Sequence, residues 1–181
     1  MTARLGILLS GSGTTYQNLA DRIADGTLQA EICVVVASRP DAYGIERAKR
    51  LGHSCVVAKD PAEVLRAHGA EFVAMCGWMR FWDPPAPWAG RTVNVHPSLL
   101  PSFGGKGMYG HHVHEAVLAH GCKVSGCTAH LVSGGYDTGP ILDQLAVRVE
   151  DGDTPDTLAA RVQAAERELY PRAIAQLLAR T

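Results

Sequence analysis

The alternation of short apolar runs with segments of helical periodicity constrains the fold of this chain more than any other feature. Runs with the length and composition of buried strands occupy residues 4–9, 31–37, 54–58, 71–76 and 92–95. Segments in which apolar residues return at helical spacing lie between and after them, at residues 15–24, 42–51, 61–69 and 111–121. Strands that alternate with helices pair through crossover connections. The order therefore predicts a parallel sheet covered by helices on both faces.

The last third of the chain predicts two more strands and one long helix. The strands are expected at residues 123–132 and 140–149, and the alternation at the end of the second is typical of a half-exposed edge strand. Thr154 is the expected N-cap of the helix, Pro155 suits its first turn, and Pro171 is expected to bend it.

Length and composition fit one globular domain and argue against several classes of function. The chain has 181 residues, of which 46% are hydrophobic, so it can bury a full core. Its net charge of −1, without a basic excess, argues against a nucleic-acid partner. No apolar run has the length of a signal peptide core or a membrane span. The five cysteines form no CxxC pair, and we interpret them as reduced core residues of a cytoplasmic protein.

These observations together define the predicted fold class. We expect an α/β protein with a Rossmann-like, open and mostly parallel sheet and helices on both faces. A single domain is expected to cover residues 1–181, because no internal repeat, low-complexity segment or linker interrupts the chain.

A glycine-rich turn follows the first expected strand, in the sequence LLSGSGTT at residues 8–15. Gly11 and Gly13 allow a tight turn that exposes backbone N–H groups at the start of a helix, where an anion is favoured. The hydroxyl groups of Ser12, Thr14 and Thr15 suit a single phosphate. Tyr16 occupies the third position of the dinucleotide fingerprint, and no P-loop Lys follows. The alternative is an ordinary strand-to-helix turn.

The strand at residues 92–95 carries an amide and an imidazole at its end. Residues i and i+2 of a strand share a face, so Asn94 and His96 point together while the flanking valines face the core. Pro97 holds His96 in an extended conformation and ends the strand. An amide donor beside a histidine at the carboxyl end of a parallel strand suits stabilisation of an oxyanion. The alternative is two polar residues at an exposed strand end.

Asp137 lies in a glycine-flanked turn, SGGYDTGP, between the last two expected strands. A carboxylate there would orient His96, raise the pKa of its imidazole and favour the imidazolium. The alternative is an Asx turn, which the sequence Asp-Thr-Gly fits well.

Aromatic side chains are concentrated in the sequence CGWMRFW at residues 76–82, directly after a buried strand. Their place next to the strand that carries Asn94 suits a flat apolar ligand, and Arg80 is placed to pair with a ligand carboxylate. The alternative is core packing beneath a loop, and the two roles are compatible.

Histidine is frequent near the glycine loop that follows His96. His111, His112 and His114, with His96 and His130, invite a metal hypothesis, but no HxxxH or HExxH spacing occurs. A GxSxG nucleophile motif is absent from the sequence as well. We therefore predict neither a metal site nor a nucleophilic triad.

The combination of motifs resembles the folate-dependent formyltransferase family. NVHPSLLP at residues 94–101 is followed by YDTGP at residues 136–140. LLSGSGTTYQNL, CGWMRF, GKGMYGHHVHEAV and VSGCTAHLV occur in the order of the family. The resemblance covers nearly the whole chain and implies the formyltransferase fold. It implies transfer of the formyl group of 10-formyltetrahydrofolate, as co-substrate, to the amine of glycinamide ribonucleotide in purine synthesis.

The resemblance also implies roles for individual residues. The family's catalytic residues match Asn94, His96 and Asp137, and its phosphate-binding turn matches Gly11, Ser12, Gly13, Thr14 and Thr15. The folate pocket matches Trp78, Met79, Arg80, Phe81, Trp82 and Tyr136, and the substrate-binding set is Glu166, Gln163 and Pro97. Residues 1–90 would then form a nucleotide-phosphate half, and residues 91–181 a catalytic and folate-binding half. The expected partners are small molecules only, with a monomer or homodimer as the assembly.

Departures from the family pattern leave alternatives open. Thr15 stands where the family commonly has Asn, the segment before residues 71–76 is shorter, and the chain ends sooner than many members. A formyltransferase for another amine, such as a nucleotide sugar or methionyl-tRNA, is one alternative. A nucleotide-binding oxidoreductase and a catalytically silent binding module are others.

Overall fold

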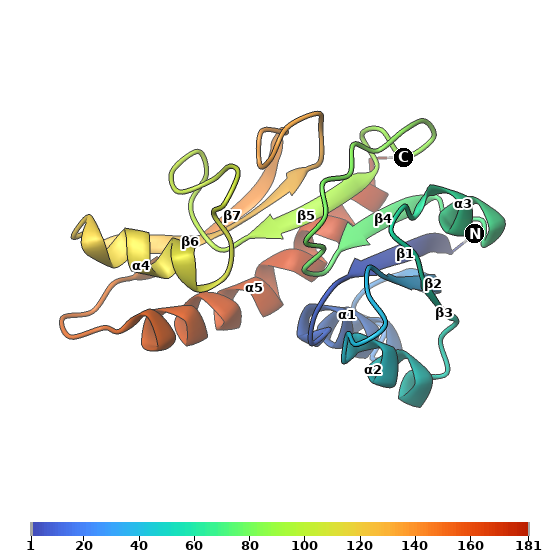
Figure 1. The fold of residues 1–181 in the computed structure, drawn as a ribbon, viewed down its shortest axis with the longest axis horizontal. Coiled ribbons are helices and arrows are strands. Elements are labelled where there is room, and N and C mark those ends of the chain that lie inside the picture. Colours follow the sequence, from blue (N-terminus) through green and yellow to red (C-terminus); the bar gives the residue numbers. More distant parts are fainter. Residues whose placement is uncertain (1, 181) are drawn as a thin grey trace.

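A computed structural model describes residues 2–180 and places seven strands of this range in one sheet (Figure 1). The strands are β1 (Ala3–Leu9), β2 (Ala30–Ala37), β3 (Cys55–Val57), β4 (Phe72–Met75), β5 (Thr92–His96), β6 (Val124–Leu131) and β7 (Ile141–Arg148). Their order across the sheet is β3-β2-β1-β4-β5-β6-β7. The first five are parallel, and β6 and β7 pair antiparallel. The predicted open, mostly parallel sheet is confirmed.

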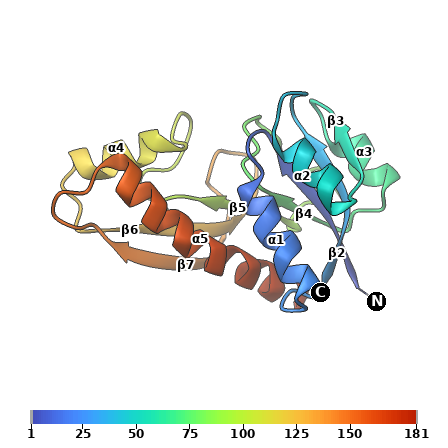
Figure 2. The same ribbon diagram turned by 90° about the horizontal axis from the view of Figure 1, so that it is seen from below.

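Helices cover both faces of this sheet, as the sequence predicted. They are α1 (Thr14–Ala24), α2 (Gly44–Leu51), α3 (Ala62–Ala67), α4 (His111–Ala119) and α5 (Pro155–Leu178). Figures 1 and 2 show α1, α2 and α5 on one side of the sheet and α3 on the other. α4 packs beside α5 near the β6–β7 end.

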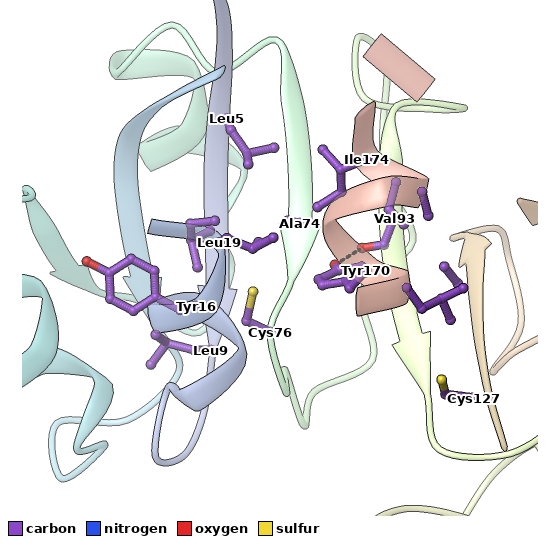
Figure 3. Packing of buried hydrophobic residues seen from close by; sticks show 14 of the residues in the cluster. Leu5, Leu9, Tyr16, Leu19, Ala74, Cys76, Val93, Cys127, Tyr170 and Ile174 are labelled. Atoms are coloured by element: carbon purple, nitrogen blue, oxygen red, sulfur yellow. Dashed lines mark hydrogen bonds between the residues drawn. The ribbon is translucent and has the colours of Figure 1, made fainter. Parts of the chain in front are cut away.

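The side-chain alternation of the strands separates the core into two layers. In β1, Leu5, Ile7 and Leu9 face the layer of α1 and α5, whereas Leu8 packs on the opposite layer against Leu65 of α3. All are almost fully buried, which explains why the strand reads as a continuous apolar run. Figure 3 shows residues of the larger layer, including Leu5 and Leu9.

Helix α5 begins where the sequence predicts. The Thr154 hydroxyl accepts a hydrogen bond from the Thr157 N–H at 3.3 Å, and the Thr157 hydroxyl accepts one from the Thr154 N–H at 2.9 Å. These two bonds form a reciprocal cap.

Pro171 does not interrupt α5, which continues to Leu178. A proline has no N–H and leaves the carbonyl four residues earlier without its helical donor. That carbonyl belongs to Arg167, and it accepts a hydrogen bond from the Asn18 side-chain amide of α1 at 3.0 Å. Asn18 thus replaces the missing donor from another helix, which a reading of α5 alone does not reveal.

The edge strand β7 alternates between partly buried and exposed positions, as predicted.

All five cysteines are free, but only Cys76 and Cys127 are buried, whereas Cys33, Cys55 and Cys122 are partly exposed. The prediction of core cysteines was therefore right for two of them. Within residues 2–180, no helix is both long and apolar enough to cross a membrane.

Candidate active site

The carboxyl ends of β1, β2 and β4 are fastened together by one buried hydroxyl. Ser10 accepts hydrogen bonds from the Ser38 hydroxyl at 2.7 Å and from the Met79 N–H at 2.8 Å. The Ser10 N–H itself donates to the Gly77 carbonyl at 3.0 Å. The loops that follow these three strands therefore have fixed relative positions. This is the edge at which open parallel sheets bind ligands.

The glycine-rich turn is held from behind by α2. The Gly44 N–H donates to the Gly11 carbonyl at 3.0 Å, and Arg47 Nε donates to the Ser12 carbonyl at 2.8 Å. Gly13, with φ of 70°, is the N-cap of α1, and no side chain among residues 2–180 caps this helix start. The first N–H groups of α1 are therefore available to an anion.

A cleft of about 660 Å³ opens over this turn. Its lining comprises Ser10, Gly11, Ser12, Gly13, Thr14, Thr15, Ser38, Arg39, Cys76, Gly77, Met79 and Arg80. Every residue predicted for phosphate binding thus lies on one cleft. Arg39 and Arg80 add positive charge to it, from the ends of β2 and β4.

Asn94, His96 and Asp137 are brought together at the end of β5. The side chains of Val93 and Val95 pack on the α5 layer, so Asn94 and His96 share the opposite face, as predicted. His96 Nδ1 lies 3.4 Å from Asp137 Oδ2, although forty residues separate them in sequence.

His130 is a fourth member of this cluster that the sequence did not identify as one. Its Nε2 lies 3.2 Å from Asn94 Nδ2 and 3.5 Å from Asp137 Oδ1, and its side chain is buried. The antiparallel register pairs Asn94 of β5 with His130 of β6. The available signal was the alternation of the 123–132 strand, but it identifies the neighbour of Asn94 only when the register is known.

The protonation of His96 differs from the prediction. Asp137 does raise the pKa of His96, as expected, and so does the Phe103 carbonyl that lies 2.8 Å from Nε2. Burial of the ring lowers it by more, and His130 lowers it further, so the net shift is downward. Asp137 therefore acts on the His96 pKa in the expected direction, but the loss of solvent, which was not part of the sequence-based prediction, outweighs it.

Asp137 occupies a position that holds it rigidly. Its φ of 55° lies in the left-handed region, which Asp and Asn tolerate better than most residues. Burial raises the pKa of this carboxyl, but hydrogen bonding to His130, the charge of His96 and the Gly105 N–H bring it below its usual value. The Gly105 bond, at 3.0 Å, ties the glycine loop to the carboxylate. Asp137 is therefore an ionised side chain with partners on three segments.

The aromatic segment lines a second cleft, of about 220 Å³, beside this cluster. Its lining includes all predicted folate-binding residues, namely Trp78, Met79, Arg80, Phe81, Trp82 and Tyr136, together with Pro97, Asn94, His96, His130 and Asp137. Trp78 is only 8% exposed and also belongs to the core, whereas Met79 and Phe81 are about half exposed. The ring centroids of Phe81 and Tyr136 lie 5.3 Å apart, so these two rings contact each other directly. Ligand-facing and core roles therefore coexist in this segment.

Gln163 and Glu166 of α5 border a small cavity beside the glycine-rich turn. The cavity is also lined by Thr14, Thr15, Asn18 and Arg167. Thr15 thus lies between this cavity and the larger cleft. Burial raises the pKa of the Glu166 carboxyl to about 7.

Comparison with known proteins identifies the family of this site and fold. Residues 3–174 match the family model described as formyl transferase. The chain belongs to the formyl transferase family. It is 37% identical to "Phosphoribosylglycinamide formyltransferase, chloroplastic" of Arabidopsis thaliana over 92% of this chain. It is also 37% identical to "Trifunctional purine biosynthetic protein adenosine-3" of Bos taurus over 98% of this chain.

The chain spans 62% of the Arabidopsis protein and 18% of the bovine one. Among solved structures, it resembles glycinamide ribonucleotide transformylase 1 from Symbiobacterium toebii with a TM-score of 0.88 and 39% identity. That match covers 96% of this chain and 86% of the other. The predicted formyltransferase fold is confirmed.

His111, His112 and His114 of α4 do not converge on one point in this formyl transferase chain. His111 Nε2 lies 3.4 Å from Asp156 Oδ1, and His112 Nδ1 lies 3.5 Å from Glu115 Oε2, both at the surface. His114 is buried in α4. Among residues 2–180, no three His, Cys, Asp or Glu side chains lie where they would share one metal ion.

Replacing Gly13 with alanine is expected to destabilise the glycine-rich turn. The new Cβ would lie 2.8 Å from the Gly44 Cα, and a left-handed φ of 70° is unfavourable for alanine. We expect a loss of about 2–4 kcal/mol in the free energy of unfolding, measured by urea denaturation. Gly11→Ala is the matched control, because nothing lies within 4 Å of its added Cβ. An equal loss in both variants would contradict the assigned close approach.

Replacing Glu166 with glutamine is expected to change how stability depends on pH. Its pKa is 4.5 when solvated and about 7 in the fold. Below pH 4.5 both states are protonated and the carboxyl has no effect. Between pH 4.5 and about pH 7 the carboxyl ionises in the unfolded state but stays protonated in the folded state. The free energy of unfolding therefore falls as pH rises through this range, by on the order of 3 kcal/mol.

Urea denaturation of the wild type and of Glu166→Gln from pH 5 to pH 8 tests this expectation. The stability of the variant relative to the wild type should rise across this range. Glu168→Gln, at an exposed position of the same helix, is the control and should show a constant difference. A pH-independent difference for Glu166→Gln would contradict the burial effect.

Proposed function

We propose that this chain transfers the formyl group of 10-formyltetrahydrofolate to the amine of 5'-phosphoribosylglycinamide, a step of purine synthesis. The observation that carries this proposal is that the two clefts share Gly77, Met79 and Arg80 as a common rim. One cleft has the chemistry of a phosphate site, and the other is aromatic and contains a cluster of polar donors. The names of the Arabidopsis relative and of the Symbiobacterium protein support the same activity.

The nucleotide substrate fits the cleft over the glycine-rich turn. We assign its phosphate to the free N–H groups at the start of α1 and the hydroxyls of Ser12, Thr14 and Thr15. Arg39 and Arg80 would balance its charge. Glu166 and Gln163 border the cavity beside the turn and are assigned to the rest of the nucleotide.

We assign the folate to the aromatic cleft, which residues 78–82 and Tyr136 line. A flat ring system can contact these side chains by its faces, and Arg80 is available for a carboxylate of the folate tail. This cleft draws on both parts of the chain, residues 1–90 and 91–181. Both proposed halves therefore contribute to the folate site, whereas the proposed phosphate site lies within residues 1–90 alone.

In the proposed reaction, the substrate amine attacks the formyl carbon, a new C–N bond forms and the bond from carbon to the folate nitrogen breaks. Asn94 would donate a hydrogen bond to the oxyanion that develops on the formyl oxygen. The second proposed donor is His96 in its protonated form, with its Nε2–H turned to the oxyanion from the Phe103 carbonyl, which it faces at 2.8 Å in the structure. Asp137 next to the ring favours that form, and the oxyanion adds a further negative charge there.

The proton balance requires one transfer from the amine to the folate nitrogen. Burial lowers the pKa of His96, which weakens the neutral ring as a proton acceptor and makes the protonated ring a stronger proton donor to the folate nitrogen. We propose that a water bound by Asp137 and His96 passes this proton. No covalent intermediate with the protein is required.

The decisive experiment mixes the purified protein with 10-formyltetrahydrofolate and 5'-phosphoribosylglycinamide and follows the absorbance of the folate. Turnover that depends on both substrates is the expected result. Turnover only with a different small amine, such as a nucleotide sugar, would replace the proposed acceptor. Binding of reduced nicotinamide without formyl transfer would overturn the proposal. A cytoplasmic location and a monomeric or homodimeric state stay predictions.

A further inference from the structure

Tyr170 of α5 places its hydroxyl between two strands beneath the proposed active site. The side chain is fully buried. Its oxygen lies 2.9 Å from the carbonyl oxygen of Met75 and 2.9 Å from that of Val93, so one O–H group serves both carbonyls. Figure 3 shows Tyr170 reaching from the helix to Val93.

The two carbonyls mark the place where β4 and β5 separate. The last registered pair of these strands is Met75 with Asn94, after which β4 ends and β5 continues to His96. Val93 immediately precedes Asn94 in the chain. The Tyr170 hydroxyl therefore joins the backbone next to Asn94 to the strand that leads into Gly77 on the shared rim.

The same helix face borders the proposed nucleotide site. Glu166 lies four residues before Tyr170, so the two side chains are neighbours on α5. Glu166 borders the cavity beside the glycine-rich turn. A single helix thus connects the residues assigned to the nucleotide with the backbone that carries the proposed oxyanion donor.

We propose that Tyr170 is a positioning residue for the reaction. Its hydroxyl fixes the distance between the ends of β4 and β5. It thereby holds the Asn94 amide at a fixed position relative to the two clefts. This inference rests on the proposed function. Misplacement of a catalytic group by a fraction of an ångström is enough to lower turnover substantially, because alignment contributes much of the rate.

Tyr170→Phe tests the proposal, because it removes the hydroxyl and keeps the ring. We expect kcat to fall about tenfold while KM for both substrates stays within about twofold. Tyr16→Phe is the matched control. Tyr16 is also fully buried in the same core, but its hydroxyl bonds His53 Nδ1, at 2.6 Å. This control should lose stability and keep its kcat at a temperature where both variants are folded.

A kcat equal to that of the wild type in Tyr170→Phe would overturn the proposal, as would an equal fall in both variants. 4-Aminophenylalanine at position 170 restores a donor and should recover most of the turnover; failure to recover in a folded variant counts against the proposal. NMR of the Asn94 side-chain amide provides a readout without turnover. Its resonance should move in Tyr170→Phe and not in Tyr16→Phe, whether or not the acceptor amine is the one proposed.

Discussion

Replacing Asn94 with alanine is expected to lower turnover by about 100- to 1000-fold, while binding of the nucleotide stays nearly intact. Asn94 lies on the face of β5 that borders the aromatic cleft, and it is not among the residues that line the cleft over the glycine-rich turn. Its amide would stabilise a charge that exists only during the reaction. Loss of the donor therefore affects the transition state and leaves ground-state binding unchanged.

Asn94→Asp sharpens this experiment. Aspartate has the shape of asparagine but, when ionised, no proton to donate, and its charge would repel an oxyanion. Its turnover should be at least as low as that of Asn94→Ala. Gln29→Ala removes an amide from an exposed position outside both clefts and serves as the control. A mild loss in steady-state assays of Asn94→Ala would refute the oxyanion role.

Replacing Asp137 with asparagine is expected to lower the pKa of His96 further and to reduce turnover by about 100-fold or more. Asparagine suits this test because it tolerates the left-handed φ of 55° and preserves the size of the side chain. The substitution removes the negative charge that lies 3.4 Å from His96 Nδ1. In the wild type this charge partly offsets the lowering of the His96 pKa by burial.

An NMR titration of the His96 ring measures the pKa directly. If the protonated ring is required, activity is lost as pH rises through the pKa of His96, and the variant should lose activity at a lower pH than the wild type. Asp143→Asn is the control, because Asp143 pairs with Arg172 outside both clefts. An unchanged His96 pKa in Asp137→Asn would show that the two groups are not coupled.

Much of the fold was predictable because its signals are local. The strand at residues 4–9 reads as a buried run because both faces of β1 are covered. Thr154 and Pro155 mark the start of α5 through hydrogen bonding and a fixed φ, which depend only on neighbouring residues. Boundaries shifted where turns intervened, as at α2, which begins at Gly44 two residues after the expected start.

The sequence by itself also determined the members of the candidate site that lie within motifs, including Asn94, His96 and the glycine-rich turn. Strand periodicity settles which side chains share a face, and parallel topology settles at which end of the sheet they lie.

Only the tertiary structure decided how distant segments meet. The register of β5 and β6 brings His130 to Asn94, and the packing of α1 on α5 lets Asn18 supply the bond that Pro171 lacks. The net pKa shift of His96 was decided in the same way, because burial depends on every segment packed around the ring. Tyr170 shows the same limit, because the two strand carbonyls that its hydroxyl joins are brought together only by the packed sheet.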